Sequence, residues 1–329
     1  VPVMRLQAEV PELRVDDMQL RGLSAKATVA DYTRAVRVDG KARLAAFDSA
    51  QVNARDVQID AAPAAGATSF RAAGIINEFR AALSGKAAQQ DARYVLTLAS
   101  LNLSKEGLSA VVDETATLVI DNGAMQIDRL VIKTGQGRTQ VAGTAGPEAI
   151  KLDVAVKRLP AALANAFDRT LGLEGHIDGA IKVSGTTAKP QADATLSWGG
   201  ASAQALRAQS LPALRVDVRA KLAGEQASGE VTVGGVEGLA IKGSGRAGLA
   251  AASQLKARID GSIPLVLANG VLGARAASAE GTLRVEADIS GAVNAPQVGG
   301  TLRIEGASLN DPASGLRLVG IAGTAQFTQ

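Results

Sequence analysis

The chain of 329 residues has no cysteine and a single histidine, His176. Without cysteine, a disulfide framework and a thiolate metal site are both excluded. With one histidine, no second imidazole is present to complete a histidine-rich metal site or to replace His176 as a general base. We therefore expect no catalytic residues, no metal site and no cofactor, and we expect a protein that is not an enzyme.

Aromatic residues are also scarce, at 2% of the chain, with one tryptophan, two tyrosines and five phenylalanines. Large aromatic side chains fill compact cores and provide the platforms on which sugars and bases stack. Basic and acidic residues are nearly balanced, at 35 and 32, and they are interspersed along the chain. A nucleic-acid surface needs clustered lysines and arginines, so neither nucleic acid nor glycan is an expected ligand.

Long apolar runs are missing as well. No stretch approaches the roughly 18 apolar residues of a membrane-spanning helix, and no basic-then-apolar signal segment opens the chain. The sequence starts with Val1, Pro2 and Val3 rather than with methionine. We expect the chain to be part of a longer protein, with any signal or membrane anchor outside it.

The chain does have strictly alternating segments. Residues 214–222 read L-R-V-D-V-R-A-K-L, with an apolar residue at every second position, and residues 283–289 and 150–157 alternate in the same way. A period of two predicts a β-strand with one apolar and one polar face. Many of the 36 glycines stand between such runs, as expected for residues in turns.

These segments predict the fold class. Strands of about nine residues span on the order of 30 Å, and short turns favour antiparallel pairing of neighbours. We predict an all-β protein, a long, curved, mostly antiparallel sheet with a few short helices. In the N-terminal part, the predicted strands cover residues 14–30, 36–47, 52–59, 94–103 and 116–132. Residues 61–66 predict a loop there, and residues 74–83 predict a short helix.

An internal repeat connects two parts of the chain. Residues 175–185 align with residues 281–291 at an offset of 106, and Pro160 aligns with Pro264 at an offset of 104. In each copy, a strand leads into a short helix, predicted at residues 161–167 and 265–271. A strand, a Ser-Gly turn containing Pro190 or Pro296, and another strand follow. Such repeats stack on a continuous core. We therefore predict an N-terminal groove segment, 1–125, and two groove repeat units, 126–223 and 224–329.

Isolated polar motifs carry little chemical signal. His176 aligns with Thr282 and falls on the polar face of a predicted strand. Asp16-Asp17 and Asp113-Glu114 are adjacent acids near predicted turns or strand ends. The functional alternatives are a general base or a metal ligand for the histidine, and a metal site or an acid–base pair for the acids. We expect all of them to be ordinary surface residues.

Two further features favour structural roles. The glycine-rich residues 135–138 and 234–238 lack the strand–loop–helix context and the Lys-Ser/Thr of a phosphate-binding loop, so they predict hairpin turns. Trp198 aligns with Ile304, which predicts packing or groove lining rather than a ligand platform.

The two Ser-Gly-x4-Pro-Gln motifs, with their flanks at residues 175–201 and 280–308, resemble a known family. They are similar to the C-terminal region of the TamB family, the inner-membrane components of the translocation and assembly module. This family belongs to the wider AsmA-like group of Gram-negative envelope proteins. The resemblance is clearest over residues 159–329.

The resemblance implies a fold, a location and a role. It implies a long β-groove with a hydrophobic inside, called a β-taco, in a periplasmic protein anchored to the inner membrane through a segment outside this sequence. It implies conduction of phospholipid between the inner and outer membranes, and support of outer-membrane protein assembly with an outer-membrane barrel of the TamA type. We expect the chain to stop short of the family's last segment, which contacts that barrel. The family has no catalytic residues.

The residues themselves also predict an apolar trough. A sheet with one apolar face covers it with helices, a second sheet or a ligand, and the predicted helices here are few and short. Acyl chains suit such a trough, because burying each CH₂ contributes about 0.8 kcal/mol. The positions expected to line it are Leu152, Val154, Val156, Ile181, Val183, Leu214, Val216, Val218, Leu222, Leu255, Ile259, Leu283, Val285, Ile289, Leu302 and Ile304.

Two alternatives stay open at this point. The same positions would form a dry core if the sheet closed on itself as a sandwich. The alternative function is a purely structural or adhesive β-solenoid or scaffold of the cell envelope, although such solenoids have short repeats of about 20–25 residues.

Overall fold

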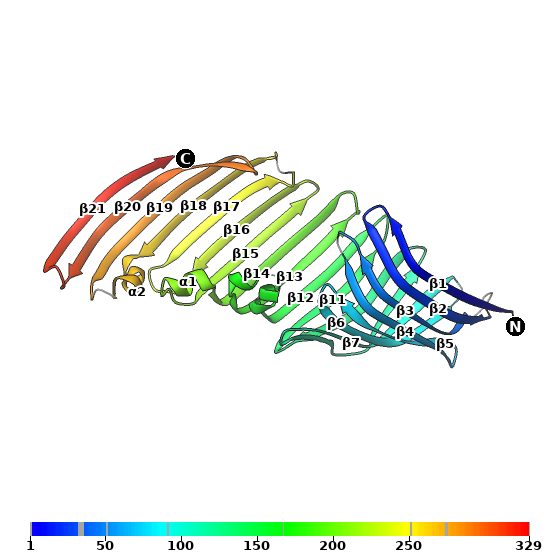
Figure 1. The fold of residues 1–329 in the computed structure, drawn as a ribbon. Coiled ribbons are helices and arrows are strands. Elements are labelled where there is room, and N and C mark those ends of the chain that lie inside the picture. The colour runs from blue at the N-terminus through cyan, green and yellow to red at the C-terminus, as the bar shows by residue number, and fades with distance from the viewer. Residues whose placement is uncertain are drawn as a thin grey trace. The chain divides into compact units, whose positions relative to one another are not determined.

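The computed structural model describes residues 2–31, 36–50, 52–90, 92–166, 168–250, 252–273 and 276–328. Strands make up 75% of the chain and belong to one antiparallel sheet, so the predicted all-β class with few short helices is confirmed. The chain divides into two compact units, Val1–Val154 (unit 1) and Ala155–Gln329 (unit 2) (Figure 1). The predicted N-terminal groove segment, 1–125, and the two predicted repeat units, 126–223 and 224–329, stay predictions.

Unit 1 is a succession of hairpins. Its strands are β1 (Val3–Val15), β2 (Met18–Ala30), β3 (Arg37–Asp48), β4 (Asn53–Ala64), β5 (Ala67–Ile76), β6 (Phe79–Gln90), β7 (Arg93–Lys105), β8 (Leu108–Val112), β9 (Ala116–Asp121), β10 (Ala124–Thr134) and β11 (Gly137–Ala145). Strands β1 to β7 pair in sequence order. The short strands β8 and β9 each pair with part of β7 and part of β10, so together they occupy one strand position.

Two predictions for unit 1 are wrong. Residues 61–66 are mostly strand, because β4 continues to Ala64 and only Ala65 and Gly66 form the turn. Residues 74–83 form the β5–β6 hairpin rather than a helix. Asn77 and Glu78, at φ of 47° and 69°, make its two-residue turn, a geometry that matches the twist of paired strands. Pairing with both neighbouring strands overrides the local preference of this segment.

Two of the predicted strands in unit 1 each contain a hairpin turn. Residues 14–30 include the end of β1, the turn at Asp16-Asp17 and all of β2. Residues 116–132 include β9, the Asn122-Gly123 turn and most of β10. Both turns begin with a positive φ, 52° at Asp16 and 48° at Asn122. Asx side chains tolerate this backbone region, and the Asn-Gly pair is a strong hairpin signal.

Unit 2 contains further hairpins and the short helices. Strand β12 (Ile150–Pro160) crosses the unit boundary, and the other strands are β13 (Glu174–Gly185), β14 (Pro190–Ser202), β15 (Leu214–Ala223), β16 (Gln226–Gly234), β17 (Ala240–Gly248), β18 (Gln254–Pro264), β19 (Ser278–Ala292), β20 (Ala295–Asp311) and β21 (Leu316–Thr328). The helical segments are η1 (Ala161–Ala166), η2 (Arg169–Leu171), α1 (Gln204–Ala208), η3 (Leu265–Ala268) and α2 (Asn269–Leu272). The helices predicted at 161–167 and 265–271 are thus confirmed, with Phe167 outside the described residues.

The sequence repeat corresponds to a repeat of backbone geometry. Gly185 faces Pro190 and Gly291 faces Pro296 at the start of each hairpin, with φ of 95° and 98° at the two glycines. Gly175 lies where the β13–β14 register shifts, and Gly281 lies where the β19–β20 register shifts. The aligned glycines therefore have the same structural roles, as turn residues and as β-bulge residues.

The strands of unit 2 lie side by side in one layer, from β13 to β21 (Figure 1). Each described strand pairs with its sequence neighbours. The helical segments follow β12, β14 and β18, so in an antiparallel meander they gather at one end of the strands. No second sheet covers the described strands within this unit, so the sandwich alternative does not hold inside unit 2.

Few side chains are shielded from water in such a fold. The chain exposes 20255 Å², whereas a compact globular protein of this mass exposes about 12,600 Å². Among the described residues, Val131 in unit 1 is the one larger side chain that is fully buried. Most apolar residues of the sheet are therefore half-buried, in contact with their neighbours and still accessible from one side.

Candidate functional site

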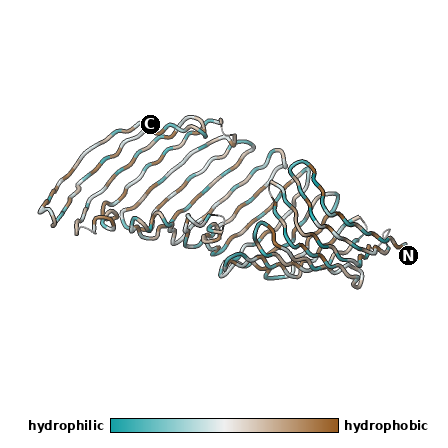
Figure 2. Tube along the Cα trace, viewed as in Figure 1, coloured by the Kyte–Doolittle hydropathy of each residue, from teal (hydrophilic) through white to brown (hydrophobic). Residues whose placement is uncertain are grey.

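Unit 2 has an apolar face and a polar face, because its strands alternate as β15 does. Figure 2 shows hydrophobic and hydrophilic residues following one another along these strands. The register sets apolar residues opposite apolar residues, for example Leu196 opposite Val218 and Val218 opposite Val231. Because a slip of one residue exchanges the two faces of a strand, this matched register keeps the apolar face continuous.

Four rows of facing residues cross the apolar face from strand to strand. Row 1 consists of Ile177, Trp198, Val216, Val233, Ile241, Gly261, Val285 and Leu302. Row 2 consists of Gly179, Leu196, Val218, Val231, Gly243, Ile259, Ala287 and Gly300. Row 3 consists of Ile181, Ala194, Ala220, Gly229, Gly245, Ala257, Ile289 and Val298. Row 4 consists of Val183, Ala192, Leu222, Ala227, Ala247 and Leu255.

Most residues predicted to line a trough lie together on this face. They are Ile181, Val183, Leu214, Val216, Val218, Leu222, Leu255, Ile259, Leu283, Val285, Ile289, Leu302 and Ile304. All of them are half-buried. On β12, Leu152 and Val154 belong to unit 1, whereas Val156 belongs to unit 2 and is buried. Contact of these residues with a lipid stays a prediction.

Row 3 is the shallowest part of the apolar face. From β14 to β18 it presents only alanine and glycine, whereas row 2 beside it contains Leu196, Val218, Val231 and Ile259. Neighbouring strands lie about 4.8 Å apart, so this stretch extends roughly 19 Å across the strands. This stretch therefore carries smaller side chains than most of row 2 beside it.

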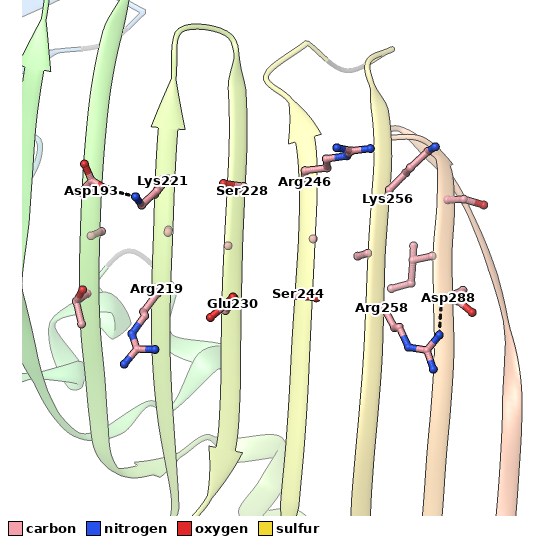
Figure 3. A pocket seen from close by; sticks show the side chains of 18 residues that line it. Asp193, Arg219, Lys221, Ser228, Glu230, Ser244, Arg246, Lys256, Arg258 and Asp288 are labelled. Carbon is pink, nitrogen blue, oxygen red and sulfur yellow. Dashed lines mark ion pairs between the residues drawn. The ribbon is translucent and has the colours of Figure 1, made fainter.

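The polar face carries an open hollow of about 760 Å³ (Figure 3). Its lining takes three successive residues from each strand, for example Arg219, Ala220 and Lys221 of β15. The outer two residues of each triplet have their side chains on the polar face, and the middle residue belongs to row 3. The residues of rows 2 and 4, which flank row 3 on the apolar face, do not line it. The hollow therefore opens on the polar face, with charged walls and a floor of backbone.

Ion pairs along single strands order the polar face. Arg215 contacts Asp217 at 3.0 Å, and Arg258 contacts Asp260 at 3.0 Å. In both cases the partners are two residues apart and therefore on one face of the strand. Hydrogen bonds from Arg215, and one from Ser197, hold the pKa of the Asp217 carboxyl below its ordinary value. Hydrogen bonds from Arg258 likewise lower the pKa of Asp260.

The isolated polar motifs have structural surroundings. His176 is exposed and lies 3.6 Å from Asp178, and the Oδ1 of Asp178 accepts a hydrogen bond from the Arg158 backbone N–H at 3.0 Å. Trp198 is half-buried in row 1, and its indole N–H donates to the carbonyl of Glu174 at 2.8 Å. The packing role predicted for Trp198 agrees with this position.

The acidic pairs lie at turns and between strands. Asp113 forms ion pairs with Lys133 and with Arg138, the latter at 3.4 Å, and Glu114 contacts Arg138 at 2.8 Å. The two acids lie between the end of β8 and the start of β9, and their cationic partners lie on β10 and β11. Across the described part of the chain, no group of three or more His, Asp or Glu residues is placed to hold a metal ion.

Sequence reasoning missed one repeated polar contact. The side-chain oxygen of Asn165 accepts a hydrogen bond from the Leu173 N–H, and that of Asn269 accepts one from the Ala279 N–H. Both asparagines stand in a Leu-Ala-Asn triplet at residues 163–165 and 267–269. Their separation of 104 residues equals that of Pro160 and Pro264. The recurrence of the triplet at this offset was the signal in the sequence that could have predicted the contact.

None of the helices among the described residues combines the length and the apolar character needed to span a membrane. Comparisons of the chain with models of known protein families, with curated proteins and with solved structures found no match.

Proposed function

We propose that the apolar face of unit 2 binds the acyl chains of phospholipids and lets them move along the sheet. The observation that supports this proposal is the single layer. The residues of rows 1 to 4, apart from the buried Ala287, stay half-buried because no second layer of described residues in the unit covers them. Contiguous apolar surface of this kind marks a binding site. A 16-carbon chain removed from water there gains roughly 12 kcal/mol at most, which is comparable to its stabilisation in a bilayer.

Movement follows from the continuity of the rows. An acyl chain on row 2 meets aliphatic or glycine positions at each strand from β14 to β20, so it crosses no charged side chain. A shallow open face also has no deep pocket to trap the lipid. We propose that the protein uses this face in the periplasm to conduct phospholipid between the inner and outer membranes. Support of outer-membrane protein assembly, with a barrel of the TamA type, belongs to the same proposal and rests on the family resemblance.

Two aspartate substitutions on neighbouring residues of β16 test the proposal. Val231 is half-buried on the apolar face, and Thr232 is exposed on the polar face. Val231→Asp places a charge in row 2, where it opposes acyl contact, because desolvating an unpaired carboxylate is costly. Thr232→Asp adds the same charge on the other face and is the matched control.

The measurement is the amount of phospholipid that co-purifies with each protein from bacterial membranes, determined by mass spectrometry. We expect Val231→Asp to lose at least fivefold relative to the unsubstituted chain, and Thr232→Asp to stay within twofold of it. Circular dichroism checks that both variants keep their strand content. Equal lipid content in all three proteins, or none in any of them, would contradict the proposal and favour a purely structural scaffold of the cell envelope.

A further inference from the structure

Two cations face each other on the polar face without an acidic partner. Arg246 on β17 is the direct cross-strand neighbour of Lys256 on β18, and both side chains are exposed. Like charges in this position repel one another and destabilise the pair. Among the described residues, neither Arg246 nor Lys256 has an ion pair or a side-chain hydrogen bond.

Other facing cations on the described strands are relieved by an acid. Arg284 faces Arg303 across β19 and β20, and Arg284 contacts Glu305 at 2.8 Å. Lys26 faces Lys41, which forms an ion pair with Asp60. Lys133 faces Arg138, and both form ion pairs with Asp113. Arg246 and Lys256 thus differ from these pairs in lacking the anion that neutralises them.

The neighbours of the pair are neutral hydrogen-bonding groups. Ser228 faces Arg246 from β16, and Ser290 faces Lys256 from β19. Gln254, two residues before Lys256, lines a second open hollow of about 410 Å³ together with both cations. Arg246 and Lys256 also line the larger hollow of 760 Å³ (Figure 3). The pair therefore stands between two hollows, accessible from both.

The nearest carboxylates lie one row away on the polar face. They are Glu230, two residues beyond Ser228, and Asp288, two residues before Ser290. Asp288 lies 3.9 Å from Arg258 and 73% of its side chain is exposed, so its charge is directed at another arginine. Neither acid forms an ion pair with Arg246 or Lys256 among the described contacts.

We infer that Arg246 and Lys256 form a binding site for a phosphate group. A guanidinium donates two parallel hydrogen bonds to phosphate oxygens, and an ammonium adds a compact positive charge. The hydroxyls of Ser228 and Ser290 and the amide of Gln254 supply further donors around the pair. The bound phosphate would neutralise Arg246 and Lys256 as Glu305 neutralises the facing pair of Arg284 and Arg303. The site lies on the face opposite rows 1 to 4, so it does not depend on acyl binding there.

The test compares two variants with the same change of charge. Arg246→Gln with Lys256→Gln removes the proposed site, and Arg284→Gln with Arg303→Gln removes two facing cations that already have an acid. Each purified chain is titrated with inorganic phosphate at constant ionic strength, and the shifts of the backbone amides are followed by NMR. We expect the Arg246/Lys256 variant to bind phosphate at least tenfold more weakly than the unsubstituted chain, and the Arg284/Arg303 variant to stay within twofold. Equal weakening in both variants, or no saturable shift at Ser228 and Ser290 in the unsubstituted chain, would overturn the inference.

Thermal unfolding gives a second measurement that does not depend on NMR. Phosphate should raise the Tm of the unsubstituted chain more than that of the Arg246/Lys256 variant, because a ligand that binds only the folded state adds to the general stabilisation by phosphate salts. An equal rise in both proteins would contradict the site.

The source of the phosphate is decided by parallel titrations with glycerophosphoglycerol and with phosphatidylglycerol vesicles, using phosphatidylcholine vesicles as the control. Binding of the diester and of the anionic vesicles, lost in the Arg246/Lys256 variant, assigns a lipid headgroup. Binding of inorganic phosphate alone, lost in the same variant, assigns a free phosphate.

Discussion

The side chain of Asn165 makes two hydrogen bonds to the backbone of Leu173, accepting from its N–H at 2.8 Å and donating to its carbonyl at 3.0 Å. Asn269 accepts from the N–H of Ala279 at 2.7 Å in the second copy of the repeat. In both copies, an asparagine of the short helical segment fixes the start of the next strand. The contact explains why the helical segments recur with little sequence similarity apart from Leu-Ala-Asn.

Replacing either asparagine by alanine should destabilise unit 2. Asn165→Ala leaves a half-buried N–H and a carbonyl without their partner, which costs about 1–3 kcal/mol. Trp198 is the chain's one tryptophan and lies in unit 2, so its fluorescence during urea unfolding reports on this unit. Asn310→Ala, at an exposed position on β20, is the control and should change stability by less than about 0.5 kcal/mol. If Asn165→Ala and Asn310→Ala changed the stability equally, the hydrogen bonds of Asn165 to Leu173 would not stabilise unit 2.

The bulge glycines should not tolerate a side chain. At Gly281 φ is +109°, and a Cβ would lie 2.6 Å from the Ala307 Cα. We expect Gly281→Ala to destabilise unit 2 by more than about 1 kcal/mol, because the backbone is strained and the neighbour is main chain. Gly299, on β20, has no positive φ, and its nearest atom would be 3.7 Å away. Gly299→Ala should therefore be neutral or slightly stabilising in the same unfolding measurement, and a comparable loss there would refute this explanation.

The fold class and the faces of the strands could be predicted from the sequence, because alternation fixes which side chains share a face. Residues 214–222 form β15 with Val216 and Val218 on the apolar side, as predicted. Alternation does not show which segments of the chain pair with a given strand. The prediction of a helix at residues 74–83 is therefore wrong: Asn77 and Glu78 form a hairpin turn, although they lack the glycine that usually marks one.

The features of the candidate sites depend on register, which the sequence does not determine. Arg246 and Lys256 are ten residues apart in the chain, and only the β17–β18 pairing sets them opposite each other. The contact of Asn165 with Leu173, eight residues further along the chain, likewise depends on how the helical segment returns to the sheet. By contrast, the pair of Arg215 and Asp217 follows from alternation alone, since residues two apart share a face.

The stability of unit 2 should fall in acid below about pH 4. Hydrogen bonds from arginines lower the pKa values of Asp217 and Asp260 in the folded chain, whereas an unfolded aspartate has a pKa of about 3.9. A lowered folded pKa contributes stability that is complete above the unfolded pKa and is lost as the pH falls through the folded pKa. The Tm should therefore be level from pH 7 to pH 5 and should decrease below pH 4.

Asn substitutions separate these two carboxylates from the others. Asp217→Asn together with Asp260→Asn should lower the Tm at pH 7 slightly, because both pairs are exposed and screened by salt. The same variant should show a smaller decrease of Tm between pH 4 and pH 2.5 than the unsubstituted chain. Parallel pH profiles for the two proteins would show that other groups control the acid response.

In unit 1, the hydroxyl of Thr68 should be needed for the start of β3. The β3–β4 pairing ends at Gly40 and Ala61, before Pro63, which has no N–H to donate. The Val38 N–H donates instead to the Thr68 Oγ1 at 2.9 Å, and Thr68 is buried. Thr68→Val keeps the shape of the side chain but removes the acceptor, so we expect a loss of about 1–3 kcal/mol and faster exchange of the Val38 amide proton. Thr68→Ser keeps the hydroxyl and should keep that amide protected. If the Val38 amide exchanged equally in both variants, the hydroxyl would not be its partner in solution.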